Sequence, residues 1–139
     1  MDGTDANEMV INIAGPNGLV VDNLSSKVFF TEGDMNKIWS ISLEGRGLST
    51  VHSLSDGAYP YGMTLYKEIL YFTTFNNKTV YTMNQSGGDV RILGTLTHSI
   101  RHLALAARNP PQTRPNHCSG NSCSNICVLT ANSARCLPA

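Results

Sequence analysis

The stretch that decides the fold is residues 27–47, KVFFTEGDMNKIWSISLEGRG. Residues 29–32 (FFTE) form an aromatic run with the alternation of a half-buried strand. After a polar turn, residues 39–43 (WSISL) place apolar and polar side chains on opposite faces. A turn then leads to another candidate strand at residues 48–51. The stretch therefore predicts a unit in which three strands are joined by two turns.

This unit returns when the sequence is shifted by 42 residues. The shift places Phe29-Phe30-Thr31 on Tyr71-Phe72-Thr73, Ile38-Trp39 on Val80-Tyr81, and Gly45 on Gly87, and one step back from Gly45 it reaches Gly3. Aromatic strand motifs repeated every 40–50 residues are typical of β-propeller blades, which have four strands each.

The remaining strands are placed by the repeat. Pro60-Tyr61-Gly62 matches Pro16-Asn17-Gly18 two residues out of register, and a shorter turn at residues 66–68 accounts for the difference. Gly15 to Gly18 is expected to be a turn. Strands are expected at residues 19–22, 63–65, 69–75, 79–83 and 90–93. Residues 8–12 (EMVIN) and 100–107 are expected to be single strands of incomplete neighbouring blades, although the alanines of the latter also fit a short helix.

Charge and hydropathy exclude several partners. The chain has 139 residues, ten of them basic and ten acidic, so its formal net charge is zero. Binding to nucleic acid or to an anionic membrane surface favours a basic surplus. No apolar run approaches the ~20 residues of a membrane span, and the N-terminal residues lack the basic and apolar regions of a secretory signal.

All four cysteines lie near the C-terminus, at Cys118, Cys123, Cys127 and Cys136. An even, clustered set in a loop-rich tail indicates a disulfide framework and an oxidising compartment. Since a secreted-type module is found here without a signal, we expect a piece of a longer protein. The proline-rich residues 109–116 read as a linker between a repeat region at 1–108 and a cysteine module at 117–139.

The aromatic motif resembles the YWTD repeat, also called the low-density lipoprotein receptor class B repeat. Its two copies here are Phe29-Phe30-Thr31-Glu32 and Tyr71-Phe72-Thr73-Thr74, so Glu32 replaces the aspartate and Thr74 removes the acid. In this family a six-bladed propeller is followed by an EGF-like module. The cysteine spacing Cys118-x4-Cys123-x3-Cys127-x8-Cys136 resembles the start of such a module.

The resemblance implies an all-β fold: a partial YWTD-type propeller of about two blades plus flanking strands, with a C-terminal, disulfide-stapled EGF-like fragment. The fragment is truncated, because Pro138 stands where the family has its fifth cysteine. Four cysteines alone allow three pairings. The EGF-like order implies Cys118–Cys127 and Cys123–Cys136. The acidic residues that mark the calcium-binding subclass are missing before Cys118, so calcium is not carried over.

By the same resemblance, the function is that of a non-catalytic extracellular fragment of a low-density lipoprotein receptor-related endocytic receptor. The parent is then a type I membrane protein of the cell surface and endosome, and the propeller–EGF unit shapes its ectodomain and assists ligand binding and release. Its partners are protein or lipoprotein ligands and the rest of the propeller, without direct membrane contact. Alternatives are a Wnt co-receptor propeller, a nidogen-like matrix protein, or an intracellular β-repeat enzyme or zinc protein.

Catalytic, cofactor and metal sites are not expected. A strand would separate His98 from His102 by roughly 13 Å. His117 with Cys118, Cys123 and Cys127 lacks the C-x2-C pair of a zinc site, which favours disulfides. Phosphate loops and nucleophile elbows are missing from the sequence, and Glu32 and Asp34 are expected to be solvated beside a turn.

Trp39 is interpreted as a buried residue of the blade core or of the packing between blades, because Tyr81 takes its place one period later. Asn23, Asn77 and Asn84 begin N-glycosylation triplets, the first two in expected turns. Two blades alone would leave apolar faces open, where Trp39 or Phe72 would meet water. We therefore expect the isolated chain to associate or to unfold in part.

Overall fold

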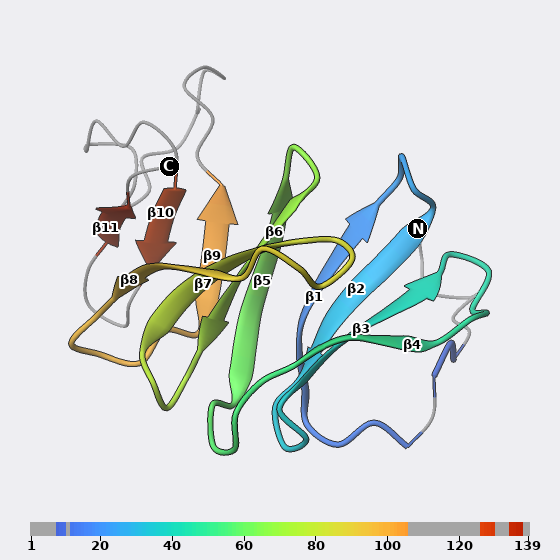
Figure 1. The fold of residues 1–139 in the computed structure, drawn as a ribbon, viewed down its shortest axis with the longest axis horizontal. Coiled ribbons are helices and arrows are strands. Elements are labelled where there is room, and N and C mark those ends of the chain that lie inside the picture. The colour runs from blue at the N-terminus through green and yellow to red at the C-terminus, as the bar shows by residue number, and fades with distance from the viewer. Residues whose placement is uncertain (1–7, 11, 106–125, 130–133, 138–139) are drawn as a thin grey trace, which may run out of the picture.

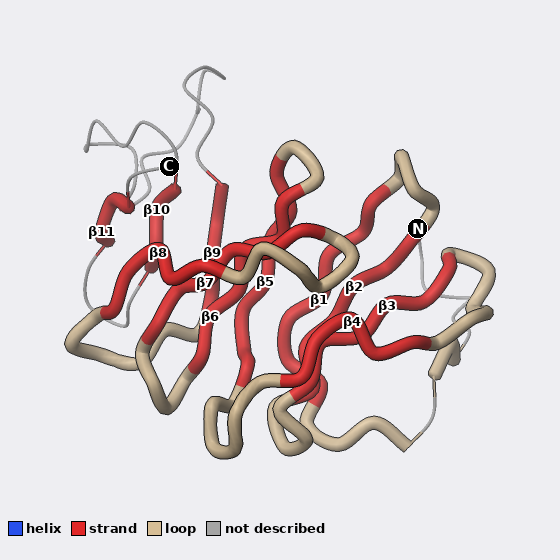
Figure 2. The backbone as a smooth tube through the Cα atoms, in the orientation of Figure 1, coloured by secondary structure: helices blue, strands red, loops and turns tan. Residues whose placement is uncertain are grey.

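The computed structural model describes residues 8–10, 12–105, 126–129 and 134–137. These residues form strands and turns arranged in three antiparallel sheets, which Figure 1 shows one after another and Figure 2 separates from the loops. Within this part of the chain, no helix is long and apolar enough to cross a membrane. The all-β architecture expected from the sequence is confirmed.

Two of the sheets have four strands each, paired in sequence order. The first sheet contains β1 (Pro16–Asp22), β2 (Lys27–Glu32), β3 (Lys37–Ser42) and β4 (Ser49–Ser53). The second contains β5 (Pro60–Tyr66), β6 (Ile69–Thr74), β7 (Thr79–Asn84) and β8 (Arg91–Thr95). The same up-and-down order in both sheets is that of propeller blades.

The offset of two residues between the copies has the expected cause. In the second sheet only Lys67 and Glu68 separate β5 from β6, with φ angles of 47° and 64°. Two positive φ values in a two-residue hairpin are the geometry of a type I′ turn. The corresponding turn of the first sheet, between β1 and β2, has four residues.

The N-terminal expectations are wrong. Among residues 8–12, the described ones form no strand, and Asn12 has a φ of 59°, outside the β region. Pro16 to Gly18 begin β1 instead of forming a turn, with a bulge between Pro16 and Leu19. A bulge keeps the chain in the sheet while bending it.

The third sheet joins the last repeat strand to the cysteine module. Strand β9 (His102–Leu105) is shorter than the expected 100–107, of which 106–107 lie outside the described residues. It pairs with β10 (Ile126–Leu129), which pairs with β11 (Ala134–Leu137). The sequence did not predict this pairing, because the two strands belong to segments that had been assigned to separate domains.

The hydrophobic core lies mainly between the first two sheets. Phe29 and Ile38 from the first sheet meet Met63, Leu70, Phe72 and Met83 from the second. The other side of the second sheet packs through Val80 on Ile100 and Leu103, next to β9. Phe72 is therefore fully buried, and the expectation that it would meet water is wrong.

Two glycines allow the inner strands to approach one another closely. A Cβ atom added to Gly18 in β1 would lie 2.3 Å from the carbonyl oxygen of Tyr61 in β5. One added to Gly62 in β5 would lie 2.5 Å from the carbonyl oxygen of Arg101, just before β9. Both distances are well inside van der Waals contact. The backbone of β1 therefore packs directly on that of β5, and the backbone of β5 packs directly on the segment that leads into β9.

Candidate functional site

The candidate site is an aromatic hollow at the edge of the molecule where β5 begins and β6 ends. Tyr59 directly precedes β5 and Tyr61 lies at its start, Phe75 and Asn76 follow β6, and Arg101 precedes β9. These residues enclose about 400 Å³ of space. In Figure 1 this edge is the lower one, where the loop before β5 and the turn after β6 both lie.

Three rings form the wall of the hollow. The ring centroids of Tyr59 and Tyr61 are 6.4 Å apart, those of Tyr59 and Phe75 are 6.3 Å apart, and those of Tyr61 and Phe75 are 5.9 Å apart. Such separations are those of interacting aromatic pairs. All three side chains remain only partly buried, so their faces are available to a ligand.

Polar groups lie at the rim of the hollow. The guanidinium of Arg101 lies 5.7 Å from the ring centroid of Phe75, a cation–π geometry that holds the cation at the rim. His102 meets the edge of the Tyr61 ring at a centroid distance of 6.1 Å. The amide of Asn76 donates to the carbonyl oxygen of Gly57 at 2.8 Å, which fixes the turn beside Phe75.

The hollow exists because the second repeat carries rings where the first carries small residues. Tyr59 and Phe75 take the places of Gly15 and Gly33. The Phe75 N–H donates to the Tyr59 carbonyl oxygen at 2.9 Å, as the Gly33 N–H does to the Gly15 carbonyl oxygen. The Tyr59 ring lies over Gly33, since a Cβ there would approach its Cζ atom at 2.8 Å. Tyr59 has a φ of 53°, and its N–H donates to the side-chain oxygen of Asn36 at 2.8 Å.

This arrangement offers groups that can bind a ligand. Aromatic faces offer apolar contact to a peptide side chain, and an exposed guanidinium offers a charged hydrogen bond to a carboxylate. The residues that line the hollow include no serine, cysteine, aspartate or glutamate that could act as a nucleophile or base. The site is therefore suited to a protein segment with an acidic residue next to an apolar one.

The threonines of the two sequence motifs lie between strands and are structural. The Oγ1 of Thr31 accepts a hydrogen bond from Gly18 N–H at 2.8 Å, and Thr73 does the same for Gly62 at 2.9 Å. Phe29, Phe30 and Phe72 are core residues, and Tyr71 is partly buried against the cluster beside β9. The motif therefore holds the blades rather than a ligand.

The expectation that Glu32 is solvated is wrong. Its side chain is 3% exposed, and its two carboxylate oxygens accept from Ala14 N–H at 2.9 Å and Trp39 Nε1–H at 2.7 Å. Thr74, its counterpart, is buried and donates to the Thr79 carbonyl oxygen at 3.4 Å. Glu32 thus retains an anchoring role that the second copy of the motif has lost.

Trp39 is partly rather than mostly buried. It packs against the cluster of Val28, Phe30 and Ile41, as the interpretation of blade packing requires. Lys37 covers its outer side, with Nζ 5.3 Å from the ring centroid. Leu43, the next residue in the alternation, is exposed, because the strand ends at Ser42.

The described histidines form no metal site. His98 precedes β9 and contacts the hydroxyl of Thr97 at 2.9 Å, whereas His102 lies in the strand. In the described ranges, no group of three or more His, Cys, Asp or Glu side chains is placed to hold a metal ion. His117 lies outside these ranges.

The expected cysteine and glycan sites are only partly covered by the structure. Cys118, Cys123 and the linker 109–116 lie outside the described residues, whereas Cys127 and Cys136 are backbone partners in the β10–β11 pair. Asn23 and Asn77 are exposed in turns. The Asn84 side-chain oxygen accepts from Ser86 N–H at 3.0 Å and Gly88 N–H at 2.8 Å, so this amide already organises a turn.

Taken together, the sheet order, the repeat and the glycine-mediated stacking define a pair of β-propeller blades. No protein-family model matches the chain. The repeat nevertheless resembles the YWTD repeat of low-density lipoprotein receptor-related proteins. The chain is 26% identical to low-density lipoprotein receptor-related protein 5 of Mus musculus and of Homo sapiens over 140 residues. These alignments cover 98% of this chain and 8% of each relative.

Solved structures support the same fold. A nidogen/laminin complex matches with a TM-score of 0.56 at 22% identity, over 63% of this chain and 35% of that chain. A putative gluconolactonase matches with a TM-score of 0.58 at 18% identity, over 72% of this chain and 36% of that chain. A streptogramin B lyase matches with a TM-score of 0.53 at 22% identity, over 63% of this chain and 28% of that chain. Two of these three are named as enzymes, so the fold alone does not decide between binding and catalysis.

Proposed function

We propose that this chain is a non-catalytic, ligand-binding part of an extracellular receptor of the low-density lipoprotein receptor-related type. The aromatic hollow carries the proposal, because three partly exposed rings and an exposed arginine converge there from three separate segments. The similarity to a receptor over 98% of the chain supports it. Since the chain spans 8% of that relative, the activity of the parent protein is part of the proposal.

The ligand class follows from the chemistry of the hollow. Arg101 favours a carboxylate, and Tyr59, Tyr61 and Phe75 favour an aliphatic or aromatic neighbour. The similar nidogen structure was solved in a complex with laminin, which supports a protein as the class of ligand. In an endocytic receptor, this site would bind the protein or lipoprotein ligands that the receptor internalises. A Wnt co-receptor or a matrix protein would use the same contact for adhesion or signalling.

The proposal includes the modifications expected outside the cell. Disulfides Cys118–Cys127 and Cys123–Cys136 would fix the cysteine module, and glycans at Asn23 and Asn77 would lie on exposed turns. We expect lower occupancy at Asn84, because its side chain is engaged by its own turn. None of the three asparagines lines the hollow, but Asn77 directly follows Asn76, which does.

Fluorescence anisotropy with two labelled peptides tests the proposed site. One peptide alternates glutamate with leucine and phenylalanine, and the matched peptide carries lysine for each glutamate. The acidic peptide is expected to bind the intact chain at least about tenfold more tightly, the effect of roughly 1.4 kcal/mol. Arg101→Glu should reverse that preference, and Phe75→Ala should weaken both peptides. Equal binding of the two peptides, unchanged by Arg101→Glu, would exclude the hollow as the site.

A further inference from the structure

Three places in the sequence join an aspartate or an asparagine to a following glycine: Asp2-Gly3, Asn17-Gly18 and Asp56-Gly57. Because glycine has no Cβ atom, its backbone nitrogen is less hindered than that of any other residue in approaching the side-chain carbonyl carbon of the residue before it. Asp2 and Gly3 lie outside the described residues. The other two pairs lie in very different surroundings.

Asp56 and Gly57 occupy an exposed turn that leads into β5, at the lower edge of the molecule in Figure 1. Ala58 N–H donates to the Ser55 carbonyl oxygen at 3.2 Å, and Gly57 has a φ of 74°, as the third residue of a type II turn has. Nothing lies within 4 Å of the position that a Cβ atom would take on Gly57. Within the described part of the chain, its N–H makes no hydrogen bond. The Gly57 nitrogen is therefore accessible to the Asp56 side chain.

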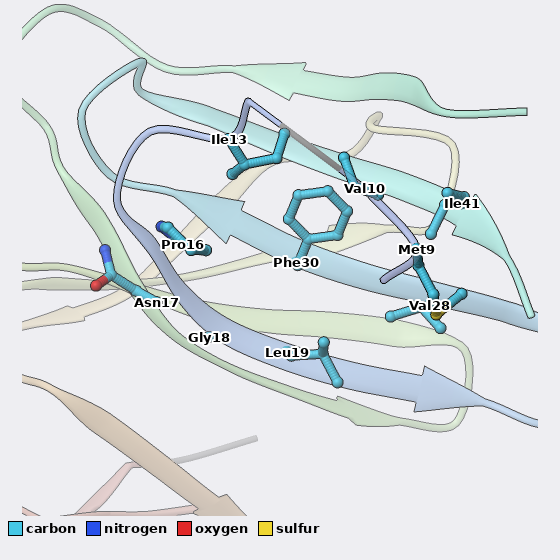
Figure 3. Close-up of a pocket in the computed structure, with 10 residues that line it drawn as sticks. All are labelled: Met9, Val10, Ile13, Pro16, Asn17, Gly18, Leu19, Val28, Phe30 and Ile41. Atoms are coloured by element: carbon cyan, nitrogen blue, oxygen red, sulfur yellow. The ribbon is translucent and has the colours of Figure 1, made fainter. Parts of the chain in front are cut away.

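Asn17 and Gly18 are instead held inside the fold. Figure 3 shows them in the first part of β1. Gly18 N–H donates to the Thr31 hydroxyl oxygen at 2.8 Å, and the Asn17 amide donates to the Pro60 carbonyl oxygen at 3.2 Å. Gly18 also packs closely on the backbone of Tyr61. The Gly18 nitrogen can react with Asn17 only after this part of the strand has opened, and such opening costs free energy.

We propose that Asp56 is a site of spontaneous conversion to isoaspartate in the folded protein, whereas Asn17 is protected by the fold. In the first step the Gly57 nitrogen forms a bond to the Cγ atom of Asp56, and the carboxyl hydroxyl leaves with the amide proton as a water molecule. The product is a cyclic succinimide. Water then adds to the ring: cleavage of the bond between nitrogen and Cγ restores aspartate, and cleavage of the bond between nitrogen and the main-chain carbonyl carbon leaves isoaspartate. The reaction consumes no oxidant or reductant, and it leaves the mass unchanged.

The conversion should disturb the aromatic hollow, because the same turn positions two of its residues. In isoaspartate the main chain runs through Cβ and Cγ, so an extra carbon atom enters the chain before Gly57. The Gly57 carbonyl oxygen accepts from the Asn76 side chain at 2.8 Å, and Tyr59 N–H donates to the Asn36 side chain at 2.8 Å. Both hydrogen bonds depend on the path of the chain between β4 and β5. Tyr59 and Asn76, which line the hollow, should therefore change their surroundings.

Long incubation of the full chain in mildly acidic buffer, with and without guanidinium chloride, tests the proposal. Peptide mapping by mass spectrometry follows deamidation of Asn17, and a protein-isoaspartyl methyltransferase with S-adenosylmethionine labels isoaspartate at Asp56. Each rate is compared with the rate at the same residue in the unfolded chain. Asp56 should react about as fast in the folded chain as in the unfolded one. Asn17 should react at least about tenfold more slowly in the folded chain, because a hydrogen bond must open first.

Asp56→Glu is the matched control, since glutamate keeps the charge but would have to close a larger ring. This variant should take up no methyl label at residue 56. After incubation, NMR spectra of the wild-type chain should show a second set of signals for the Tyr59 N–H and the Asn76 side-chain amide. The incubated Asp56→Glu chain should keep single signals.

Three results would overturn the proposal. The first is a folded chain in which Asp56 stays unlabelled, and the second is a folded chain that slows the reaction of Asp56 as much as that of Asn17. The third is an isomerised Asp56 that leaves the signals of Tyr59 and Asn76 unchanged. These measurements contain no ligand, so their outcome is independent of the peptide measurements.

Discussion

The hydroxyl of Thr31 in the first blade donates a hydrogen bond of 2.7 Å to the carbonyl oxygen of Tyr61 in the second. The Oγ1 atom of Thr31 also accepts a hydrogen bond from Gly18 N–H within the first blade. The threonine of the aromatic motif therefore joins two strands of its own blade and the inner strand of the next. It does so beside Tyr61, whose ring forms part of the aromatic hollow.

Replacing this threonine should weaken the contact between the blades. Thr31→Val keeps the shape but leaves Gly18 N–H and the Tyr61 carbonyl without their partner, at a cost of about 1–3 kcal/mol. Thr31→Ser retains the hydroxyl and serves as the control. Urea unfolding of both variants measures the difference, and a Thr31→Val loss no larger than that of Thr31→Ser would contradict the assigned role.

Gly18 should tolerate no side chain. In Gly18→Ala the new methyl group meets the Tyr61 carbonyl oxygen and the Met63 nitrogen, which are backbone atoms and cannot rotate away. We expect a loss of about 2–3 kcal/mol, typical of overpacking. Gly88→Ala is the control, because its nearest neighbour at 3.1 Å is the side chain of Asn84. Thermal melts that show equal losses for both variants would argue against close stacking of the inner strands.

Glu32 and Trp39 should be energetically coupled. Glu32→Gln replaces one acceptor oxygen with an NH2 group, so that two hydrogen-bond donors face each other. The change should lower the free energy of unfolding by about 2 kcal/mol. Trp39→Phe removes the indole N–H that bonds to the carboxylate at 2.7 Å. In the Trp39→Phe background, the cost of Glu32→Gln should fall by about 1 kcal/mol. Strictly additive losses in chemical denaturation would show that the two side chains act independently.

Acid should weaken the link between the two blades at the end opposite the hollow. Hydrogen bonds from Ser25 and from Gln85 of the second blade lower the pKa of Asp22 below its ordinary value of 3.8. A depressed folded pKa contributes stability above the unfolded pKa and loses it as the pH falls through the folded one. Wild-type stability should therefore decline below about pH 4.

Gln85→Ala is the variant that isolates this effect, because it removes the bond of 2.8 Å to Asp22 from the neighbouring blade. Its unfolding midpoint should fall less steeply with acid than that of the wild-type chain. Urea midpoints measured along a pH series provide the comparison. An unchanged slope in Gln85→Ala would mean that the bond between the blades does not contribute.

The sequence predicted the blades because local alternation and the 42-residue period determine strands and turns. The repeat correctly placed Phe29 and Phe72 in blade strands, which are β2 and β6. The burial of Glu32 could not be predicted in this way, because its two partners, Ala14 and Trp39, lie in other segments. The path of residues 8–14 was missed for a similar reason. Their apolar residues have a strand-like pattern, but Asn12 has a positive φ, and Val10 and Ile13 pack on Val28, Phe30 and Ile41 of the first sheet.

The aromatic hollow was also missed, although the sequence carried a signal for it. Tyr59 and Phe75 stand where the first copy of the repeat has Gly15 and Gly33, and large rings in place of glycine indicate a local addition to the repeat. The convergence of these rings with Arg101 depends on the stacking of blades, which brings together segments about 40 residues apart. Differences between repeat copies thus identify candidate sites better than the shared positions do.

The most direct test of the central claim is an NMR titration of the isotope-labelled full chain with the acidic peptide. If the hollow is the binding site, the amide signals of Tyr59, Tyr61, Phe75 and Arg101 should shift together and saturate with one dissociation constant. The lysine peptide should leave them in place. Shifts confined to residues around Leu19 on β1, or no saturable shift at any residue, would contradict the account of this chain as a blade pair that binds protein ligands through its aromatic hollow.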